Sequence, residues 1–173
     1  RIAFGVETGS QRIMDLNGKS ITVEKVKNCF KWAHEAKLRI IDAGFMIGSH
    51  PDENYEDVEQ TVKLIKAINP VYYSVSVIVP LPGTAIYNQM KKEGLIISND
   101  WESFSYIGKT PSWRTRHFSP DELVRLQKYV IRKTYFRAIY IVRLFTRIKN
   151  FNEFRYFMNI GVEAAKYIYL NRS

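Results

Sequence analysis

Three short apolar stretches, spaced at similar intervals, constrain the fold of this chain most strongly. They begin near Ile2, Arg39 and Val71 and are rich in β-branched and aromatic residues, a composition that favours strands. Each stretch is followed by a segment with helical periodicity, and about thirty residues per strand and helix suit a crossover between parallel strands. The sequence therefore predicts an α/β fold with three strand–helix units.

Polar residues suited to capping helices mark the boundaries of these elements. Four of them precede segments with apolar residues at helical spacing: Ser10, Thr22, Asn54 and Thr84. Strands are expected at residues 2–6, 39–47 and 71–79, and a short helix at residues 11–17. Three units are too few to close a barrel. We therefore expect residues before Arg1, the C-terminal segment or a partner to complete the sheet.

Charge divides the 173 residues into two parts. Residues 1–110 contain 13 Lys/Arg and 13 Asp/Glu, whereas residues 111–173 contain 13 Lys/Arg, 4 Asp/Glu and 13 of the 24 aromatic residues. The net charge of +9 therefore lies in the second part. We assign residues 1–110 to an α/β domain and residues 111–173 to a basic, aromatic helical extension.

The extension begins with a capping-box sequence, Ser119-Pro120-Asp-Glu122. It predicts one helix to about residue 149 and a second at residues 153–170. A basic helical face is usually a solvated surface. The functional alternatives are an anionic membrane surface and nucleic acid. Of these two alternatives the membrane ranks above nucleic acid, because a peripheral association suits a lipid-like substrate, but a solvated surface remains the first interpretation.

Residues that bind metals are sparse in this chain. Cys29 is the only cysteine, which excludes a disulfide framework and an all-cysteine metal site within the chain. His34, His50 and His117 are scattered without metal-ligand spacing. One unpaired cysteine suits a reducing cytoplasm. The chain begins at Arg1 with no initiator Met, so we expect it to be a piece of a longer protein.

Turn-forming and acidic residues follow all three predicted strands, at residues 5–10, 48–53 and 80–84. The carboxyl ends of parallel strands share one edge, and ligands bind there. A carboxylate such as Glu7 can accept two hydrogen bonds from a sugar diol. Alternatively, Glu7 caps the next helix and the glycines only permit tight turns. Spacing alone leaves both interpretations open.

Four sequence blocks carry a resemblance to a known family. The blocks are Phe4-Gly-Val-Glu-Thr-Gly-Ser10, Ile13-Met-Asp-Leu-Asn-Gly-Lys19, Gly44-Phe-Met-Ile-Gly48 and Pro80-Leu-Pro-Gly-Thr-Ala-Ile-Tyr87. In this order they resemble the second half of a radical S-adenosylmethionine (SAM) enzyme of the cobalamin-binding branch that includes anaerobic magnesium-protoporphyrin ester cyclase. The resemblance covers about residues 1–110. It implies the C-terminal part of a partial (β/α)6 TIM-like barrel, followed by the α-helical extension.

The resemblance implies roles in SAM binding at the end of the first strand. Glu7 would hold the ribose hydroxyls, and Lys19 would bind the SAM carboxylate as a point charge rather than as a bidentate fork. Ser10 would lie beside the methionine moiety. No catalytic residue is assigned within the chain.

The next strand would contact adenine through Met46, Ile47 and Gly48. The turn that follows departs from the family pattern Gly-Phe-Pro-Gly-Glu-Thr, since here it is Gly48-Ser-His-Pro-Asp-Glu53. It keeps an acid at Asp52, but Pro51 replaces a glycine and fixes φ near −65°. We therefore expect a rebuilt loop and carry over no substrate contact from it.

The resemblance also implies cofactors and partners. SAM would bind this chain, whereas the Cys-x3-Cys-x2-Cys ligands of a 4Fe–4S cluster and any cobalamin domain would lie outside it, so the chain alone should be inactive. The implied partners are a small-molecule substrate (lipid-like or a tetrapyrrole), the missing N-terminal half and, through the basic extension, a membrane surface; nucleic acid is disfavoured. The expected location is the cytoplasm or the inner membrane face. The alternative is a non-catalytic α/β binding module whose basic extension binds membrane or nucleic acid.

Overall fold

A three-stranded parallel sheet organises the first part of the chain. The computed structural model describes residues 1–98, 104, 110–137, 140, 142 and 151–169. These fall into two units, Arg1–Gln127 and Lys128–Ser173. In the first unit the strands β1 (Ile2–Glu7), β2 (Ile41–Ile47) and β3 (Tyr72–Val77) pair in parallel in the order β1-β2-β3. The three predicted strands are confirmed, each within about two residues.

Helices follow each strand, as the cap residues predict. They are α1 (Gln11–Leu16), α2 (Val23–Glu35), α3 (Tyr55–Ile68), α4 (Ala85–Lys92), α5 (Pro120–Tyr135) and α7 (Phe151–Tyr169). The side chains of the four predicted caps, Ser10, Thr22, Asn54 and Thr84, each accept a hydrogen bond from the first turn of the following helix. Such caps satisfy backbone N–H groups that the helix itself leaves unpaired.

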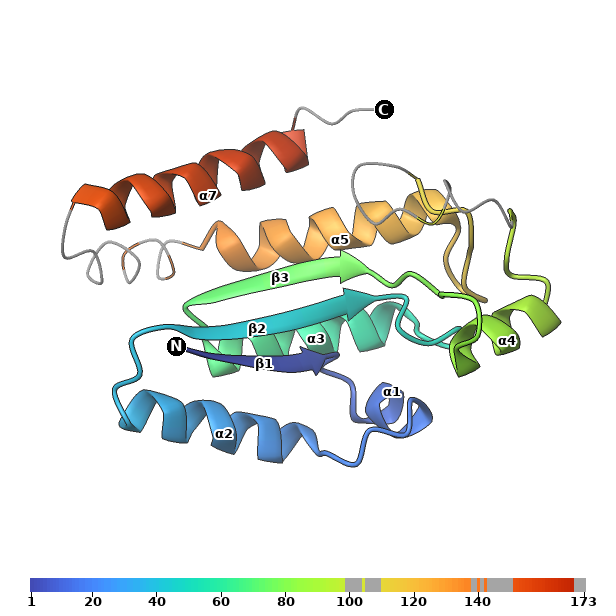
Figure 1. The fold of residues 1–173 in the computed structure, drawn as a ribbon, viewed down its shortest axis with the longest axis horizontal. Helices are drawn as coiled ribbons and strands as arrows, with labels where there is room; N and C mark the ends of the chain where they lie inside the picture. Colours follow the sequence, from blue (N-terminus) through green and yellow to red (C-terminus); the bar gives the residue numbers. More distant parts are fainter. Residues whose placement is uncertain (99–103, 105–109, 138–139, 141, 143–150, 170–173) are drawn as a thin grey trace. The chain divides into compact units, whose positions relative to one another are not determined.

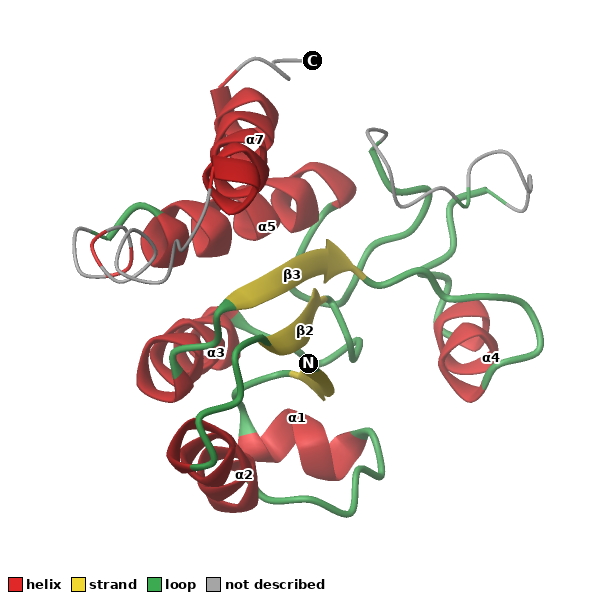
Figure 2. Cartoon of the chain, turned by 60° about the vertical axis from the view of Figure 1, so that its left-hand side comes forward, coloured by secondary structure: helices red, strands yellow, loops and turns green. Residues whose placement is uncertain are grey.

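The two faces of the sheet differ in what covers them. α2 and α3 lie along one face (Figures 1 and 2), where the ring of Phe4 lies 4.9 Å from that of Phe30 in α2. Apolar strand side chains fill the layer between sheet and helices: Ile41, Ala43, Phe45, Ile47, Tyr73 and Val75. The opposite face, called the open face below, carries Ala3, Gly5, Asp42, Gly44, Met46, Tyr72, Ser74 and Ser76; all are exposed or half-buried except Asp42, which is buried and pairs with Arg1. Toward the carboxyl ends of the strands, the open face is therefore lined by glycines, serines and one methionine.

The fold class is confirmed at the level of a mixed α/β chain, but a TIM-like barrel is not shown. The three strands form a sheet with two outer edges, β1 and β3, rather than a closed ring. At the β3 edge, the side-chain amide of Gln127 in α5 donates to the Val75 carbonyl over 2.7 Å. Part of this edge is therefore hydrogen-bonded to the middle of α5.

The two C-terminal helices, α5 and α7, depart from prediction at one point. The capping box at Ser119 and Glu122 is present, but α5 ends at Tyr135 rather than near residue 149. Arg137 donates its Nε–H to the Thr134 carbonyl over 3.1 Å, which satisfies a carbonyl that the helix end exposes. Residues 143–150 lie outside the described residues, and α7 confirms the second predicted helix. The division at residue 110 stays a prediction.

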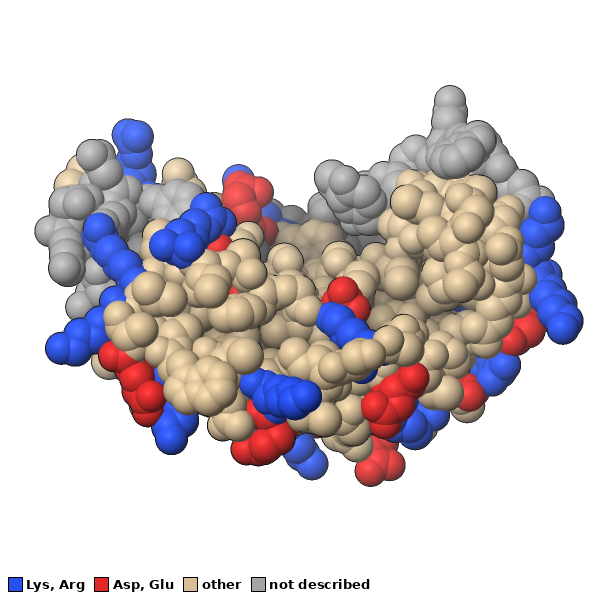
Figure 3. Space-filling view, turned by 60° about the horizontal axis from the view of Figure 1, so that its bottom comes forward, with Lys and Arg blue, Asp and Glu red and all other residues tan. Residues whose placement is uncertain are grey.

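Positive and negative side chains are mixed on the surface drawn in Figure 3. On α2, for example, Lys27 pairs with Glu24 over 3.4 Å and Lys31 with Glu35 over 3.8 Å. This mixture agrees with the balanced charge of residues 1–110. Among the described helices, none combines the length and apolar character needed to span a bilayer.

Candidate functional site

The carboxyl end of β1 has an unusual backbone. The register between β1 and β2 shifts between Gly5 and Glu7, which marks a β-bulge, and Glu7 has a φ of 72°. A residue other than glycine in this left-handed region costs on the order of 1–3 kcal/mol, a strain that is concentrated at functional sites. Bulges redirect side chains in the same way. The bulge and the positive φ therefore determine the direction in which the Glu7 side chain leaves the strand.

The Glu7 carboxylate lies over the open face. A Cβ atom added to Gly5 would lie 3.8 Å from Glu7 Oε1, and Gly5 belongs to that face. The Glu7 side chain is 35% exposed, so its oxygens remain accessible to a ligand. The structure thus places a half-exposed carboxylate beside a glycine at the carboxyl edge of a parallel sheet.

Lys19 holds this carboxylate in place. Its Nζ lies 3.0 Å from Glu7 Oε2 and donates to the Gly5 carbonyl over 2.6 Å and the Val6 carbonyl over 3.3 Å. An ammonium group has three N–H donors, so these acceptors account for all of them. Binding of a ligand carboxylate by Lys19, as predicted, requires the ammonium to release one of these acceptors.

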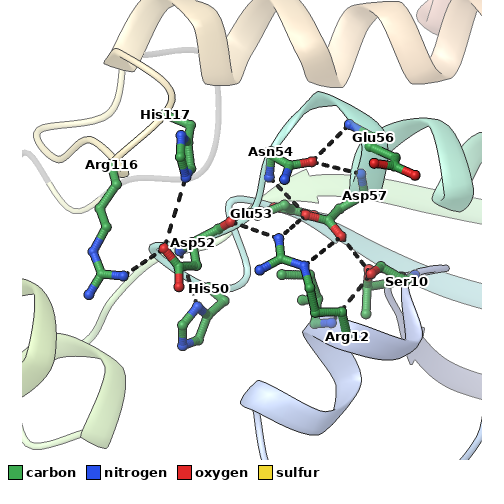
Figure 4. Close-up of polar contacts among 12 residues, drawn as sticks. Ser10, Arg12, His50, Asp52, Glu53, Asn54, Glu56, Asp57, Arg116 and His117 are labelled. Carbon is green, nitrogen blue, oxygen red and sulfur yellow. Dashed lines mark hydrogen bonds and ion pairs between the residues drawn. The ribbon is translucent and has the colours of Figure 1, made fainter.

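The buried carboxylate of Asp57 joins the first turns of α1 and α3 (Figure 4). It accepts hydrogen bonds from Ser10 Oγ over 2.6 Å, from the Asn54 N–H over 2.9 Å and from the Arg12 guanidinium. Burial alone would raise the pKa of Asp57, but the hydrogen bonds from Arg12, Ser10 and Asn54 outweigh it and lower the pKa. The hydroxyl of Ser10, fully buried, is thus already engaged within the protein.

Glu53 is a second buried acid, in the turn after β2. It is 0% exposed, and its Oε2 accepts from the Gly48 N–H and, over 3.1 Å, from the Ser49 N–H. Glu53 Oε1 has no hydrogen-bond partner in the described structure. Burial raises the pKa of Glu53 to about 8, although the two N–H groups act in the opposite direction. Glu53 is therefore a neutral acid at pH 7.

Asp52, which the sequence suggests as the acid of this turn, lies instead at the surface. Its Oδ1 pairs with Arg116 over 2.6 Å, and this hydrogen bond lowers the pKa of Asp52. Arg116 also pairs with Glu93 over 2.7 Å. The interior position goes to Glu53, whose longer side chain reaches the Gly48 and Ser49 N–H groups.

The predicted residues of β2 separate between the two faces. Met46 lies half-buried on the open face, whereas the Ile47 side chain is fully buried on the helix-covered face. Gly48 has a φ of 72°, and a Cβ there would lie 2.9 Å from Leu123 Cδ2. Of the six predicted residues, the structure thus pairs Glu7 with Lys19, places Met46 on the open face and buries Ser10, Ile47 and Gly48.

Sequence reasoning missed three residues of this region, Arg12, Glu53 and Asp57. The spacing of Asn54 and Asp57 is that of a capping box, which the structure contains, so this signal was available. No local pattern indicates the contact with Arg12, since it joins residues 45 positions apart. Within the described part of the chain, no group of three or more His, Cys, Asp or Glu side chains is placed to hold a metal ion.

Comparisons with known proteins place this geometry in a functional context. No family model matches the chain. It is 28% identical over 142 residues to an uncharacterized methyltransferase of Pyrococcus horikoshii, covering 82% of this chain and 30% of that protein. It is 26% identical over 109 residues to bacteriochlorophyllide d C-8(2)-methyltransferase of Chlorobaculum tepidum, covering 61% and 24%. The chain thus spans less than a third of either curated relative.

These relatives contradict the identification as a radical SAM enzyme of the cobalamin-binding branch. Both are named as methyltransferases, so 5′-deoxyadenosyl-radical chemistry, the iron–sulfur cluster and cobalamin are not supported. The four sequence blocks that suggested them lie mostly at strand ends and the turns beside them. Such turns indicate where a parallel α/β fold binds ligands, but enzymes that catalyse many different reactions use the same edge of the sheet. SAM as a cofactor remains consistent with methyltransferase relatives.

Proposed function

We propose that this chain is the SAM-binding part of a methyltransferase. The observation that carries the proposal is the Glu7 carboxylate, held over the open face by a β-bulge, a positive φ and Lys19. The names of both relatives support an enzyme and methyl transfer. The chain contributes binding and orientation of the cofactor, and no catalytic residue is assigned in it.

The residues present fit the chemistry of SAM. The two Glu7 oxygens can accept hydrogen bonds from a ribose diol, and such bonds to a charged acceptor are strong. Gly5 and Gly44 have no side chains to project from the open face, so a purine can approach the backbone there, beside the polarizable side chain of Met46. When bound, SAM supplies an activated methyl group. Lys19 fixes the Glu7 carboxylate and offers a cation near the cofactor's own carboxylate.

The open face also suggests how the sheet continues in a longer protein. Both relatives are more than three times as long as their matched segments, and a parallel sheet is normally covered on both faces. The proposal therefore includes further strands, in a larger sheet or a partial TIM-like barrel, that enclose the open face. A small-molecule substrate, lipid-like or a tetrapyrrole like the one in the second relative's name, would reach SAM from there.

Replacing Glu7 by glutamine should weaken SAM binding about tenfold to hundredfold. The change removes a charged acceptor, and hydrogen bonds to charged groups contribute about 1.5–3 kcal/mol. Calorimetric titration of the purified protein with SAM or S-adenosylhomocysteine measures the loss. Glu24→Gln is the matched control, because it removes an acid from another surface pair with lysine. Equal affinities for Glu7→Gln and the unchanged protein would reject the proposed contact.

A methyl group added to the open face should block the cofactor without unfolding the protein. The Cβ of Gly44→Ala would lie 3.9 Å from its nearest neighbour, Ser74 Oγ, which is ordinary contact. We expect the urea midpoint to change little and SAM affinity to fall about tenfold, the effect of overpacking a contact by one methyl. Gly161→Ala, in open space on α7, is the control. Unchanged affinity in Gly44→Ala would place the ligand elsewhere.

A further inference from the structure

The C-terminal helix α7 carries an exposed apolar stripe. Phe151 is 75% exposed, Met158 45% and Val162 46%, and Phe154 stacks on Phe151 with ring centroids 6.3 Å apart. These four residues, called the α7 stripe, recur at intervals of three or four and so lie along one side of the helix. From Phe151 to Val162 the stripe is about 16 Å long. Exposed apolar surface of this kind marks interaction sites.

The opposite side of α7 packs within its own unit. Tyr167 follows Met158 by nine residues, or two and a half helical turns, and therefore lies on the other side of the helix. There Lys128 Nζ of α5 lies 5.5 Å from the centre of the Tyr167 ring, and burial raises the pKa of Tyr167. The α7 stripe consequently faces away from the side that contacts α5.

Two basic side chains border one edge of the stripe. Arg155 follows Phe151 by four residues and Lys166 follows Val162 by four, and both are exposed. Lys166 also pairs with Glu163 over 2.9 Å. Residues 128–173 as a whole contain ten Lys/Arg and two Asp/Glu, a net charge of +8. The apolar stripe thus belongs to a unit with a strong positive charge.

We propose that α7 docks in the interface of an anionic lipid bilayer, with the α7 stripe inserted and Arg155 and Lys166 at the level of the headgroups. Helices that lie in a bilayer interface combine an apolar face with flanking Lys or Arg, whose stems extend along the apolar layer while their charges stay in water. Nucleic acid fits less well, since phosphate contacts leave the apolar stripe exposed. A second copy of the chain would bring two units of like charge together. This inference does not depend on the proposed methyltransferase activity.

Sedimentation with vesicles tests the proposal. The purified protein is mixed with vesicles of phosphatidylcholine alone, or with about a third phosphatidylserine to supply negative surface charge. We expect binding to the anionic vesicles at low salt and at least tenfold weaker binding at about 1 M salt, where the Debye length is about 3 Å. Equal binding to both vesicles, insensitivity to salt or absence of binding would overturn the proposal.

Matched variants distinguish the contribution of the α7 stripe to vesicle binding from that of the overall positive charge. The double change Phe151→Ser and Met158→Ser should weaken vesicle partitioning at least tenfold, whereas Trp32→Ser, an exposed aromatic change on α2, should not. Arg155→Gln with Lys166→Gln should weaken partitioning to anionic vesicles about fivefold for each residue replaced. Lys27→Gln with Lys31→Gln on α2 removes the same charge as a control. Equal losses in the stripe and control variants would overturn the proposal.

Other partners for the stripe have distinct signatures. A self-association that Phe151→Ser with Met158→Ser abolishes, measured by light scattering without lipid, would reassign the stripe to a dimer interface. Binding to single- or double-stranded oligonucleotides is the second alternative. If this binding competes with vesicles and is unchanged in the Phe151→Ser, Met158→Ser variant, the basic residues bind nucleic acid rather than lipid. Either result would overturn the lipid proposal. Circular dichroism checks that each variant stays helical.

Discussion

Replacing Gly9 by alanine should destabilise the protein by more than about 3 kcal/mol, a large part of the 5–15 kcal/mol typical of a domain. A Cβ at this position would lie 2.5 Å from both the Gln60 carbonyl oxygen and Thr61 Cα in α3. Both atoms belong to the backbone, so relief requires moving the helix rather than a side chain. The movement would also strain the bond from the Gly9 N–H to Thr61 Oγ1, now 2.8 Å.

Urea unfolding followed by tryptophan fluorescence measures this loss. Gly5→Ala is the matched control from the same strand end, because its Cβ would meet only the flexible end of Glu7, at 3.8 Å. We expect the control to change the free energy of unfolding by less than about 1 kcal/mol, within the range of surface substitutions. An unfolding midpoint for Gly9→Ala equal to that of the control would show that the turn and α3 can separate freely.

Glu53 should make the protein less stable as the pH rises from about 5 to 8. Its pKa in the folded protein is about 8, against an ordinary value of 4.5, so the unfolded chain releases this proton first. Stability from the neutral acid is complete below the unfolded pKa and is lost as the pH passes through the folded pKa. The difference corresponds to about 3–5 kcal/mol. Glu53→Gln, which keeps a neutral side chain, should abolish this decline and unfold at higher urea than the unchanged protein at pH 9.

Asp52→Asn is the control, because the contribution of Asp52 to the free energy of unfolding depends on pH in the opposite direction. The hydrogen bond from Arg116 lowers the pKa of Asp52, so its contribution is present above its unfolded pKa and is lost only as the pH falls through the lower, folded value. Urea midpoints between pH 5 and 9 should therefore keep the same slope in this variant. A slope that survives in Glu53→Gln would show that another group titrates over this range.

Local sequence signals predicted the elements because local chemistry determines them. The N-caps Ser10, Thr22 and Asn54 lie where the helices begin, since a side-chain oxygen there satisfies N–H groups of the first turn. Strand order could not be read in the same way, but the crossover length favoured parallel pairing, which is what the sheet shows. The end of α5 at Tyr135 was missed, because no glycine or proline marks it.

The chemistry of the site was harder to predict than its place. Turn residues pointed to the carboxyl edge of the sheet, where the proposed site lies, but the positive φ of Glu7 has no signal in a residue that rarely adopts it. The burial of Glu53 depends on how its turn packs in the folded chain. The same turn sequences suggested a radical enzyme, whereas the relatives are named as methyltransferases. The sequence therefore predicted a binding edge, which stays a prediction, and it did not specify the reaction.

The Asp57 carboxylate has a consequence for motion at this edge. It accepts hydrogen bonds from Ser10 and Arg12 at the beginning of α1 and from Asn54 at the beginning of α3, so one buried group joins the segments that follow β1 and β2 at one edge of the sheet. If either segment opens to solvent, the buried Asp57 carboxylate loses hydrogen-bond partners while it remains in the interior, which is costly. We therefore expect the two segments to open as one cooperative unit, so that a ligand that rigidifies the first also slows amide exchange in the second.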